Sequence, residues 1–164
     1  MKLIVKDKKL YLNKDLFTCS IGRNGLTKNK REGDGKTPIG IFRFTEIFYR
    51  EDKISKLDFR IKSTMIQKNY GWCDDPRHEM YNKLIKFPFI ASAENLYRND
   101  AIYDLLIVIN YNMNPVVPFK GSAIFLHIAH EDLKSTEGCI ALRRDDLLNV
   151  AENISENTVL IIES

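Results

Sequence analysis

Residues 123–128 read AIFLHI, and residues 136–142 read TEGCIAL. The first stretch is an apolar run of strand-forming residues with His127 near its end, and the second places Cys139 directly behind a glycine at the start of another apolar run. Two strands joined by a short loop would bring these two side chains to one edge of a sheet. An imidazole that takes the proton of a nearby thiol holds the sulfur as a thiolate at neutral pH, the minimum that cysteine nucleophilic catalysis requires. The sequence therefore predicts a catalytic pair formed by His127 and Cys139.

The same residues also have a purely structural interpretation. A histidine at the end of a buried strand is often a satisfied core residue, and a Gly-Cys pair is often a tight turn with a buried thiol. The spacing of His127 and Cys139 by itself leaves both interpretations open.

Both stretches resemble the catalytic signature of the YkuD family of L,D-transpeptidases, in which a strand ends in the catalytic histidine and a Ser/Thr-x-Gly-Cys turn presents the nucleophile. Thr136, Gly138 and Cys139 match this turn. A second family motif, Thr-Pro-x-Gly-x-Phe, is matched by residues 37–42, TPIGIF. The resemblance covers nearly the whole chain and implies a mainly β, mixed β-sandwich-like fold with few helices.

The resemblance also implies the roles of the site residues. His127 is the base, oriented by a backbone carbonyl, and Cys139 is the nucleophile that forms a thioester. The backbone N–H groups of Gly138 and Cys139 are the candidates for the oxyanion hole.

The implied substrate is a peptidoglycan stem tetrapeptide, at the bond between the L-centre of a diamino acid and D-alanine. The turn Thr-Glu-Gly-Cys resembles the cytoplasmic L,D-carboxypeptidase branch of the family, where it replaces the commoner Ser-His-Gly-Cys. We therefore expect removal of the terminal D-alanine from soluble muropeptides during cell-wall recycling. The alternatives are an L,D-transpeptidase that forms cross-links and a non-catalytic muropeptide-binding module, which would have no need of both His127 and Cys139.

Two positions depart from the commoner family pattern. Glu137 stands where many members have histidine, so it is not expected to be the essential base. Ala141 stands where many members carry arginine or asparagine, so another group must meet the substrate carboxylates. Five arginines are possible replacements: Arg43, Arg50, Arg77, Arg98 and Arg143.

Length and composition predict a single domain, residues 1–164. A chain of 164 residues with 44% hydrophobic residues is long enough for one proper core and suggests no second one. The net charge of +3 comes from 25 basic and 22 acidic residues spread along the chain, so no concentrated basic face is predicted. Binding to nucleic acid or to a membrane surface is therefore disfavoured.

The cysteine count and the first thirty residues predict a cytoplasmic protein. The longest uninterrupted apolar run in those residues is Leu3-Ile4-Val5, far short of a signal-peptide core. Three cysteines at wide spacings, Cys19, Cys73 and Cys139, suit free thiols in a reducing compartment better than a disulfide framework.

The hydrophobic pattern predicts mostly strands and one clear helix. Residues 105–109, LLIVI, are expected to form a central strand that is buried on both faces. Residues 51–67 are predicted as strand or irregular structure, and residues 95–104 as a short helical or turn segment. Further strands are expected at 3–6, 9–12, 16–21, 40–49 and 158–162, and a helix within 143–154.

Residues 69–82, NYGWCDDPRHEMYN, are dense in groups that bind polar ligands. Two interpretations are open: a substrate-binding loop, or a solvated loop that is anchored by packing of Trp72 against the core. On the first interpretation, Asp74 and Asp75 bind the ammonium and amide groups of a zwitterionic stem peptide. The predicted substrate-binding residues are Trp72, Asp74, Asp75, Tyr81, Asn82, Tyr111, Thr136 and Glu137.

Two cofactor interpretations are disfavoured by spacing. Residues 35–37, GKT, lack the earlier glycine of a phosphate-binding loop because Lys30 stands there, and Pro38 would block the helix that follows such a loop. Cys73, His78, His130 and Cys139 could together form a zinc site, but their spacing shows no paired Cys-x-x-Cys pattern. Zinc bound to Cys139 would also prevent this residue from acting as the nucleophile. Neither a metal nor a cofactor is therefore predicted.

Overall fold

A computed structural model describes residues 1–55 and 58–164. Within these residues the chain is mainly β, with one helix near the C-terminus, α1 (Arg144–Asn153). The strands of the largest sheet are β1 (Lys2–Lys6), β2 (Lys9–Leu12), β3 (Asp15–Ser20), β6 (Gly40–Tyr49), β7 (Ser63–Met65), β11 (Leu105–Ile109), β12 (Phe125–Ile128), β13 (Ile140–Leu142) and β14 (Val159–Ile162).

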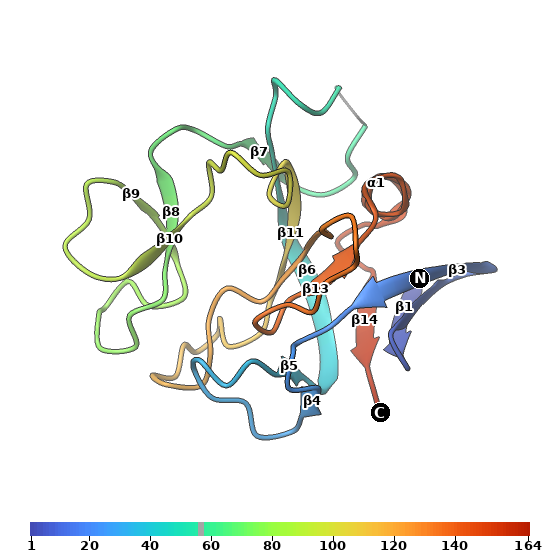
Figure 1. Ribbon diagram of the computed structural model, residues 1–164, viewed down its shortest axis with the longest axis horizontal. Helices are drawn as coiled ribbons and strands as arrows, with labels where there is room; N and C mark the ends of the chain where they lie inside the picture. Colours follow the sequence, from blue (N-terminus) through green and yellow to red (C-terminus); the bar gives the residue numbers. More distant parts are fainter. Residues whose placement is uncertain (56–57) are drawn as a thin grey trace.

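This sheet closes into a barrel (Figure 1). Its order is β11-β12-β13-β3-β2-β1-β14-β6, and β6 pairs back with β11 to complete a ring of eight strands in the described part of the chain. The long strand β6 makes this closure possible, because its first half pairs with β14 and its second half with β11. The short strand β7 runs parallel to the second half of β6, outside the ring.

Strand β11 separates two hydrophobic clusters, because alternate side chains of a strand point to opposite faces. Leu105, Ile107 and Ile109 belong to the cluster that also holds residues of β1, β14 and α1. Leu106 and Val108 belong to a second cluster beneath the site described below. All five residues are buried, so the predicted central strand is confirmed.

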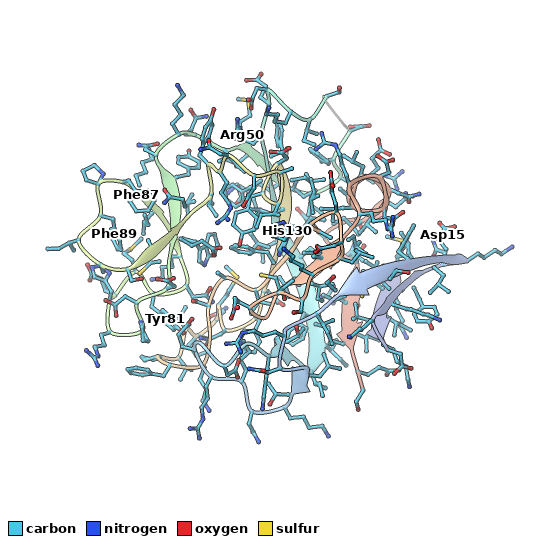
Figure 2. The ribbon with its side chains drawn as sticks, in the orientation of Figure 1. Asp15, Arg50, Tyr81, Phe87, Phe89 and His130 are labelled. Atoms are coloured by element: carbon cyan, nitrogen blue, oxygen red, sulfur yellow. The ribbon has the colours of Figure 1, made fainter. Side chains whose placement is uncertain are left out.

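A three-stranded sheet packs beside the barrel, in the order β10 (Ala93–Asn95), β8 (Tyr70–Cys73) and β9 (Leu84–Lys86). Trp72 on β8 contacts the barrel through edge-on packing against Phe48 and Phe125, with ring centroids 6.4 and 5.2 Å apart. Figure 2 shows the side chains between the two parts, with Tyr81 and Phe87 on the side of the small sheet. A further pair, β4 (Leu26–Thr27) and β5 (Thr37–Pro38), runs in parallel.

Helix α1 confirms the predicted C-terminal helix. Leu147, Val150 and Ala151 are its buried residues, and they lie at helical spacing on one face. Asp145 and Asp146 occupy the first turn, where their negative charges interact favourably with the positive end of the helix dipole. Among the described residues, no helix has the length and apolar character that a membrane span requires.

Most predicted strands agree with the structure to within a residue at each end. The sandwich-like fold takes the form of a closed barrel, and the predicted class, mainly β with one clear helix, is confirmed. In the uncertain stretch 51–67, residues 63–65 form β7, and residues 56 and 57 lie outside the described residues. Residues 96–104 form turns and bends, as one of the two interpretations of 95–104 predicts.

Candidate active site

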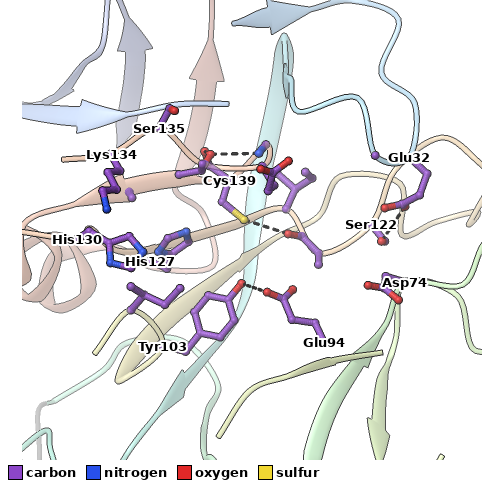
Figure 3. Close-up of a pocket in the computed structure, with 18 of the residues that line it drawn as sticks. Glu32, Asp74, Glu94, Tyr103, Ser122, His127, His130, Lys134, Ser135 and Cys139 are labelled. Atoms are coloured by element: carbon purple, nitrogen blue, oxygen red, sulfur yellow. Dashed lines mark hydrogen bonds between the residues drawn. The ribbon is translucent and has the colours of Figure 1, made fainter. Parts of the chain in front are cut away.

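The parallel pairing of β12 and β13 brings His127 and Cys139 together. Leu126 lies opposite Ile140 and His127 opposite Ala141, while Cys139 immediately precedes β13. Residues 129–139 form the connection that returns the chain to the start of β13, since parallel strands need a crossover. Both side chains line a cavity of about 500 Å³ (Figure 3).

A backbone carbonyl fixes the orientation of His127. Its Nδ1 lies 2.8 Å from the carbonyl oxygen of Ile128. Because a carbonyl can only accept, Nδ1 carries the proton and Nε2 is left as the basic nitrogen. The Tyr103 ring packs edge-on against the imidazole, with centroids 5.3 Å apart. This is the carbonyl orientation that the family resemblance implies.

Burial favours the neutral forms of the catalytic pair. Burial raises the pKa of Cys139 to about 12, and the negative charge of Glu94 acts in the same direction. Burial lowers the pKa of His127 to about 4. The Cys139 thiol donates to the carbonyl oxygen of Ala123, 3.1 Å away. Both shifts favour a neutral thiol and a neutral imidazole over the thiolate that the sequence predicts, so proton transfer would accompany attack.

The turn before Cys139 requires glycine at 138. Gly138 has φ of +142°, and a Cβ there would lie 2.9 Å from the carbonyl oxygen of Lys36. The Thr136 hydroxyl spans the turn, accepting from the Gly138 N–H at 3.1 Å and donating to the Cys139 carbonyl at 2.6 Å. This local network holds the nucleophile at the end of the cavity.

Thr37 joins the two sequence motifs in space. Its buried hydroxyl accepts from the Gly22 N–H at 2.8 Å and donates to the Gly138 carbonyl at 2.8 Å. The upstream motif, residues 37–42, therefore supports the turn of the nucleophile about a hundred residues later in the chain.

The two predicted oxyanion donors differ in their availability. The Gly138 N–H is already bonded to Thr136, whereas the Cys139 N–H makes no hydrogen bond to any described residue. Lys30 adds positive charge at this point, because its Nζ would lie 3.4 Å from a Cβ on Gly138. That charge also acts to lower the pKa of Cys139, against the larger effects of burial and Glu94.

Three of the eight predicted substrate-binding residues line the cavity, namely Asp74, Thr136 and Glu137. Glu137 is paired with Arg23 at 3.0 Å, and its side chain is largely exposed at the rim. The other five residues lie outside the cavity lining: Trp72, Asp75, Tyr81, Asn82 and Tyr111.

Four of these five residues contact one another or backbone groups, whereas the Tyr81 hydroxyl donates to Glu32, which lines the cavity. The Asn82 amide accepts from the Trp72 indole N–H and from the Ala123 N–H, each at 3.0 Å, and donates to the Tyr111 carbonyl at 3.1 Å. Asn82 therefore ties the small sheet to the segment that leads into β12. Asp75 accepts from the Arg77 N–H at 3.0 Å, within its own turn.

Several cavity residues were missed by the sequence analysis. Among the five arginines considered, only Arg98 lines the cavity. Arg50, labelled in Figure 2, directly follows β6 and holds the segment that contains Arg98. Its guanidinium stacks 3.7 Å from the centre of the Tyr97 ring and donates to the Arg98 carbonyl at 3.0 Å. The density of charged and aromatic residues in 94–104 is the signal that could have identified Glu94 and Tyr103. The missed residues include Lys30, Glu32, Glu94, Tyr103, Ser122 and Lys134.

The residues considered for zinc do not form one site. His78 accepts from the Met80 N–H within its own turn, and Cys73 is buried outside the cavity lining. Across residues 1–55 and 58–164, no cluster of three or more His, Cys, Asp or Glu side chains is arranged to hold a metal ion.

Residues 1–162 match the family model of the L,D-transpeptidase catalytic domain, YkuD. A comparison with curated proteins finds no match.

Proposed function

Because the chain belongs to the YkuD family of L,D-transpeptidase catalytic domains, we propose that it is an L,D-carboxypeptidase that removes the terminal D-alanine from stem tetrapeptides. The family implies a cysteine enzyme whose substrate is a stem peptide of peptidoglycan. The observation that carries the catalytic assignment is the placement of Cys139 in one cavity with His127, whose Nδ1 proton is held by the Ile128 carbonyl.

The reaction follows from this placement. Nε2 of His127 takes the thiol proton as Cys139 Sγ attacks the carbonyl of the third stem residue. The Cys139 N–H is available to the developing oxyanion, with Lys30 nearby. The C–N bond then breaks, and D-alanine leaves with the proton from the imidazolium. A water molecule, deprotonated by His127, attacks the thioester; the acid is released and the sulfur regains its proton.

Hydrolysis, rather than transfer to another stem, is supported by the turn 136–139, which resembles the carboxypeptidase branch. We further propose that the protein acts in the cytoplasm on recycled muropeptides. The three free cysteines, of which Cys19 and Cys73 are buried, suit a reducing compartment.

The deciding experiment supplies a disaccharide tetrapeptide ending in D-alanine and follows the products by mass spectrometry. We expect loss of one alanine with the wild type and no reaction with Cys139→Ala. Cys19→Ala, which removes a buried thiol outside the cavity lining, is the matched control and should react. Cross-linked dimers would show transpeptidation instead, and binding without any product would favour the muropeptide-binding module.

A further inference from the structure

Three carboxylates form one side of the cavity, and we call them the acidic wall: Glu32, Asp74 and Glu94. They come from separate parts of the chain, the loop after β4, the turn after β8, and β10. In Figure 3 they lie on one side of Cys139, whereas His127, His130 and Lys134 lie on the other. The fold therefore gathers negative charge on the side of the nucleophile opposite its base.

Within the described residues, the hydrogen bonds donated to the acidic wall come from neutral groups. Glu32 accepts from the hydroxyls of Tyr81 and Ser122, the latter at 2.8 Å, and Glu94 accepts from the Tyr103 hydroxyl at 2.6 Å. Asp74 Oδ1 is buried and has no hydrogen-bond partner among the described residues. A buried carboxylate oxygen without a partner is costly, so this atom indicates a missing donor.

The cations that line the cavity are paired elsewhere. Lys30 Nζ bonds Asp34 at 2.5 Å, and Arg98 makes two bonds to Asp100, at 2.7 and 2.8 Å. In the part of the chain that the structure describes, no ion pair reaches the acidic wall. Burial raises the pKa of Glu94; the Tyr103 hydrogen bond and the positive charge of Arg98 oppose this rise, and the smaller effects of Asp74 and Glu32 add to it. Arg98 therefore offsets part of the charge of Glu94 from a distance, but no cation of the described residues is bonded to the wall itself.

An organic ammonium group suits this wall better than a metal ion. The carboxylates do not converge on a metal-sized position, since no metal-binding cluster occurs among the described residues. A primary ammonium group has three N–H donors and can bond separated acceptors. A cavity of about 500 Å³ also has room for a peptide that carries such a group.

The wall acts on the nucleophile through its charge. After burial, the negative charge of Glu94 is the next contribution that raises the pKa of Cys139. A cation bound at the wall would offset this charge and favour loss of the thiol proton. Occupancy of the wall and reactivity of Cys139 are then coupled.

We propose that the acidic wall binds a primary ammonium group of the substrate, and that this binding makes Cys139 more nucleophilic. The proposal rests on the proposed function, in which the substrate carries a diamino acid at its third position. On this proposal, Cys139 is poorly reactive until a substrate with a free side-chain ammonium group binds at the wall and activates it.

Alkylation of Cys139 by neutral iodoacetamide tests the coupling without any peptide turnover. Peptide mapping follows the rate of alkylation at Cys139 separately from the rates at Cys19 and Cys73. Pentylamine is the probe for an ammonium group. Its control is pentanol with sodium chloride added to the same ionic strength. We expect pentylamine to accelerate alkylation of the wild type about three- to tenfold, since one unit of pKa changes the thiolate fraction tenfold. An amine that slows alkylation or leaves its rate unchanged overturns the proposal.

Variants of the wall make the test specific. Glu94→Gln, which still accepts from Tyr103, should be alkylated faster than the wild type without amine and should not respond to amine. Asp74→Asn should respond less than the wild type, which keeps the test informative if Glu94→Gln fails to fold. Glu46→Gln is the matched control, because Glu46 also accepts from a hydroxyl, that of Thr64, but lies outside the cavity lining. Wild-type behaviour of both wall variants would contradict the proposal.

A peptide comparison separates this proposal from the proposed function. Tetrapeptides with lysine or Nε-acetyllysine at the third position differ in the side-chain charge and in one added acetyl group. We expect a kcat/KM at least about tenfold lower for the acetylated peptide, with a smaller difference in Asp74→Asn. Equal values for the two peptides would overturn ammonium recognition. If neither peptide is processed, the proposed function fails, while the alkylation result still decides whether the wall binds an ammonium group.

Discussion

At the scale of single residues, burial determines the charge state of the catalytic pair. His127 is 5% exposed, and its one polar partner is a carbonyl that holds the Nδ1 proton. Burial stabilises the neutral imidazole and outweighs the opposite effect of the Ile128 carbonyl, so the ring can accept a proton at physiological pH. A histidine held by a carboxylate would instead tend to be charged before the reaction begins. The structure therefore favours general-base catalysis over a preformed ion pair.

The depressed pKa of His127 predicts a specific pH dependence of stability. Its pKa is about 4 in the folded protein, compared with 6.5 for the unperturbed group. Between these values the unfolded chain binds a proton that the folded protein does not, so the free energy of unfolding falls as the pH is lowered from about 6.5 to about 4. We expect the wild type to lose about 2 kcal/mol more than His127→Gln between pH 7.5 and pH 5.

Urea denaturation of both proteins at the two pH values measures this difference. The carboxylates that also titrate in this range are common to both proteins, so their contribution cancels in the comparison. An equal loss of stability in the two proteins would show that His127 titrates normally in the folded state.

At the scale of elements, Thr37 couples strand β5 to the turn of the nucleophile. Its hydroxyl is fully buried and bridges the Gly22 N–H and the Gly138 carbonyl. We expect Thr37→Val to reduce the free energy of unfolding by about 1–3 kcal/mol, because both backbone groups lose their partner. We also expect a lower kcat, since the turn at Gly138 would no longer be held in place.

Thr27, on the neighbouring strand β4, supplies the matched control. Its hydroxyl accepts from the exposed Asn29 N–H, so Thr27→Val should cost less than about 1 kcal/mol and leave kcat unchanged. Denaturation and steady-state hydrolysis of the two variants would settle the role of Thr37. Similar effects of the two substitutions would mean that the hydroxyl does not support the nucleophile turn.

The elements also show what the sequence can predict. Residues 40–49 and 105–109 have clear hydrophobic patterns of strands, and the strands predicted there have the same bounds as β6 and β11 in the structure. The short strands β8, β9 and β10 have three or four residues each, and their pairing depends on packing against the barrel. Their positions therefore could not be derived from local patterns, and the acidic wall, which depends on them, was largely missed.

The interpretation of residues 69–82 shows the same limit at the level of side chains. Their composition indicated a ligand-binding loop, and Asp74 does line the cavity. Trp72 and Asn82, however, bond each other and are buried at 4% and 2% exposure. Aromatic and amide groups serve equally well in a pocket or in its supporting structure, and only tertiary packing distinguishes the two uses.

At the scale of the whole molecule, strand β11 stands between the core of the barrel and the cluster beneath the active site. Leu106 and Ile107 are adjacent and both fully buried, but they face opposite clusters. Leu106 lies directly opposite His127 in the pairing of β11 with β12. Edge-on ring contacts within its cluster run from Trp72 through Phe125 to Tyr103, which packs on His127. Packing on this face is thus continuous with the catalytic base.

This arrangement predicts that two equally buried positions differ in their effect on activity. Leu106→Ala and Ile107→Ala should each reduce the free energy of unfolding by about 2–5 kcal/mol, as large-to-small substitutions in a core do. Leu106→Ala should also lower kcat at a temperature where both variants are folded, because the cavity it leaves adjoins His127. Ile41→Ala, at a position 73% exposed on β6, should change neither property. If Leu106→Ala and Ile107→Ala lower kcat equally, the orientation of His127 depends on the barrel as a whole. If only Leu106→Ala lowers kcat, the orientation of His127 depends on the cluster that the barrel shares with the small sheet.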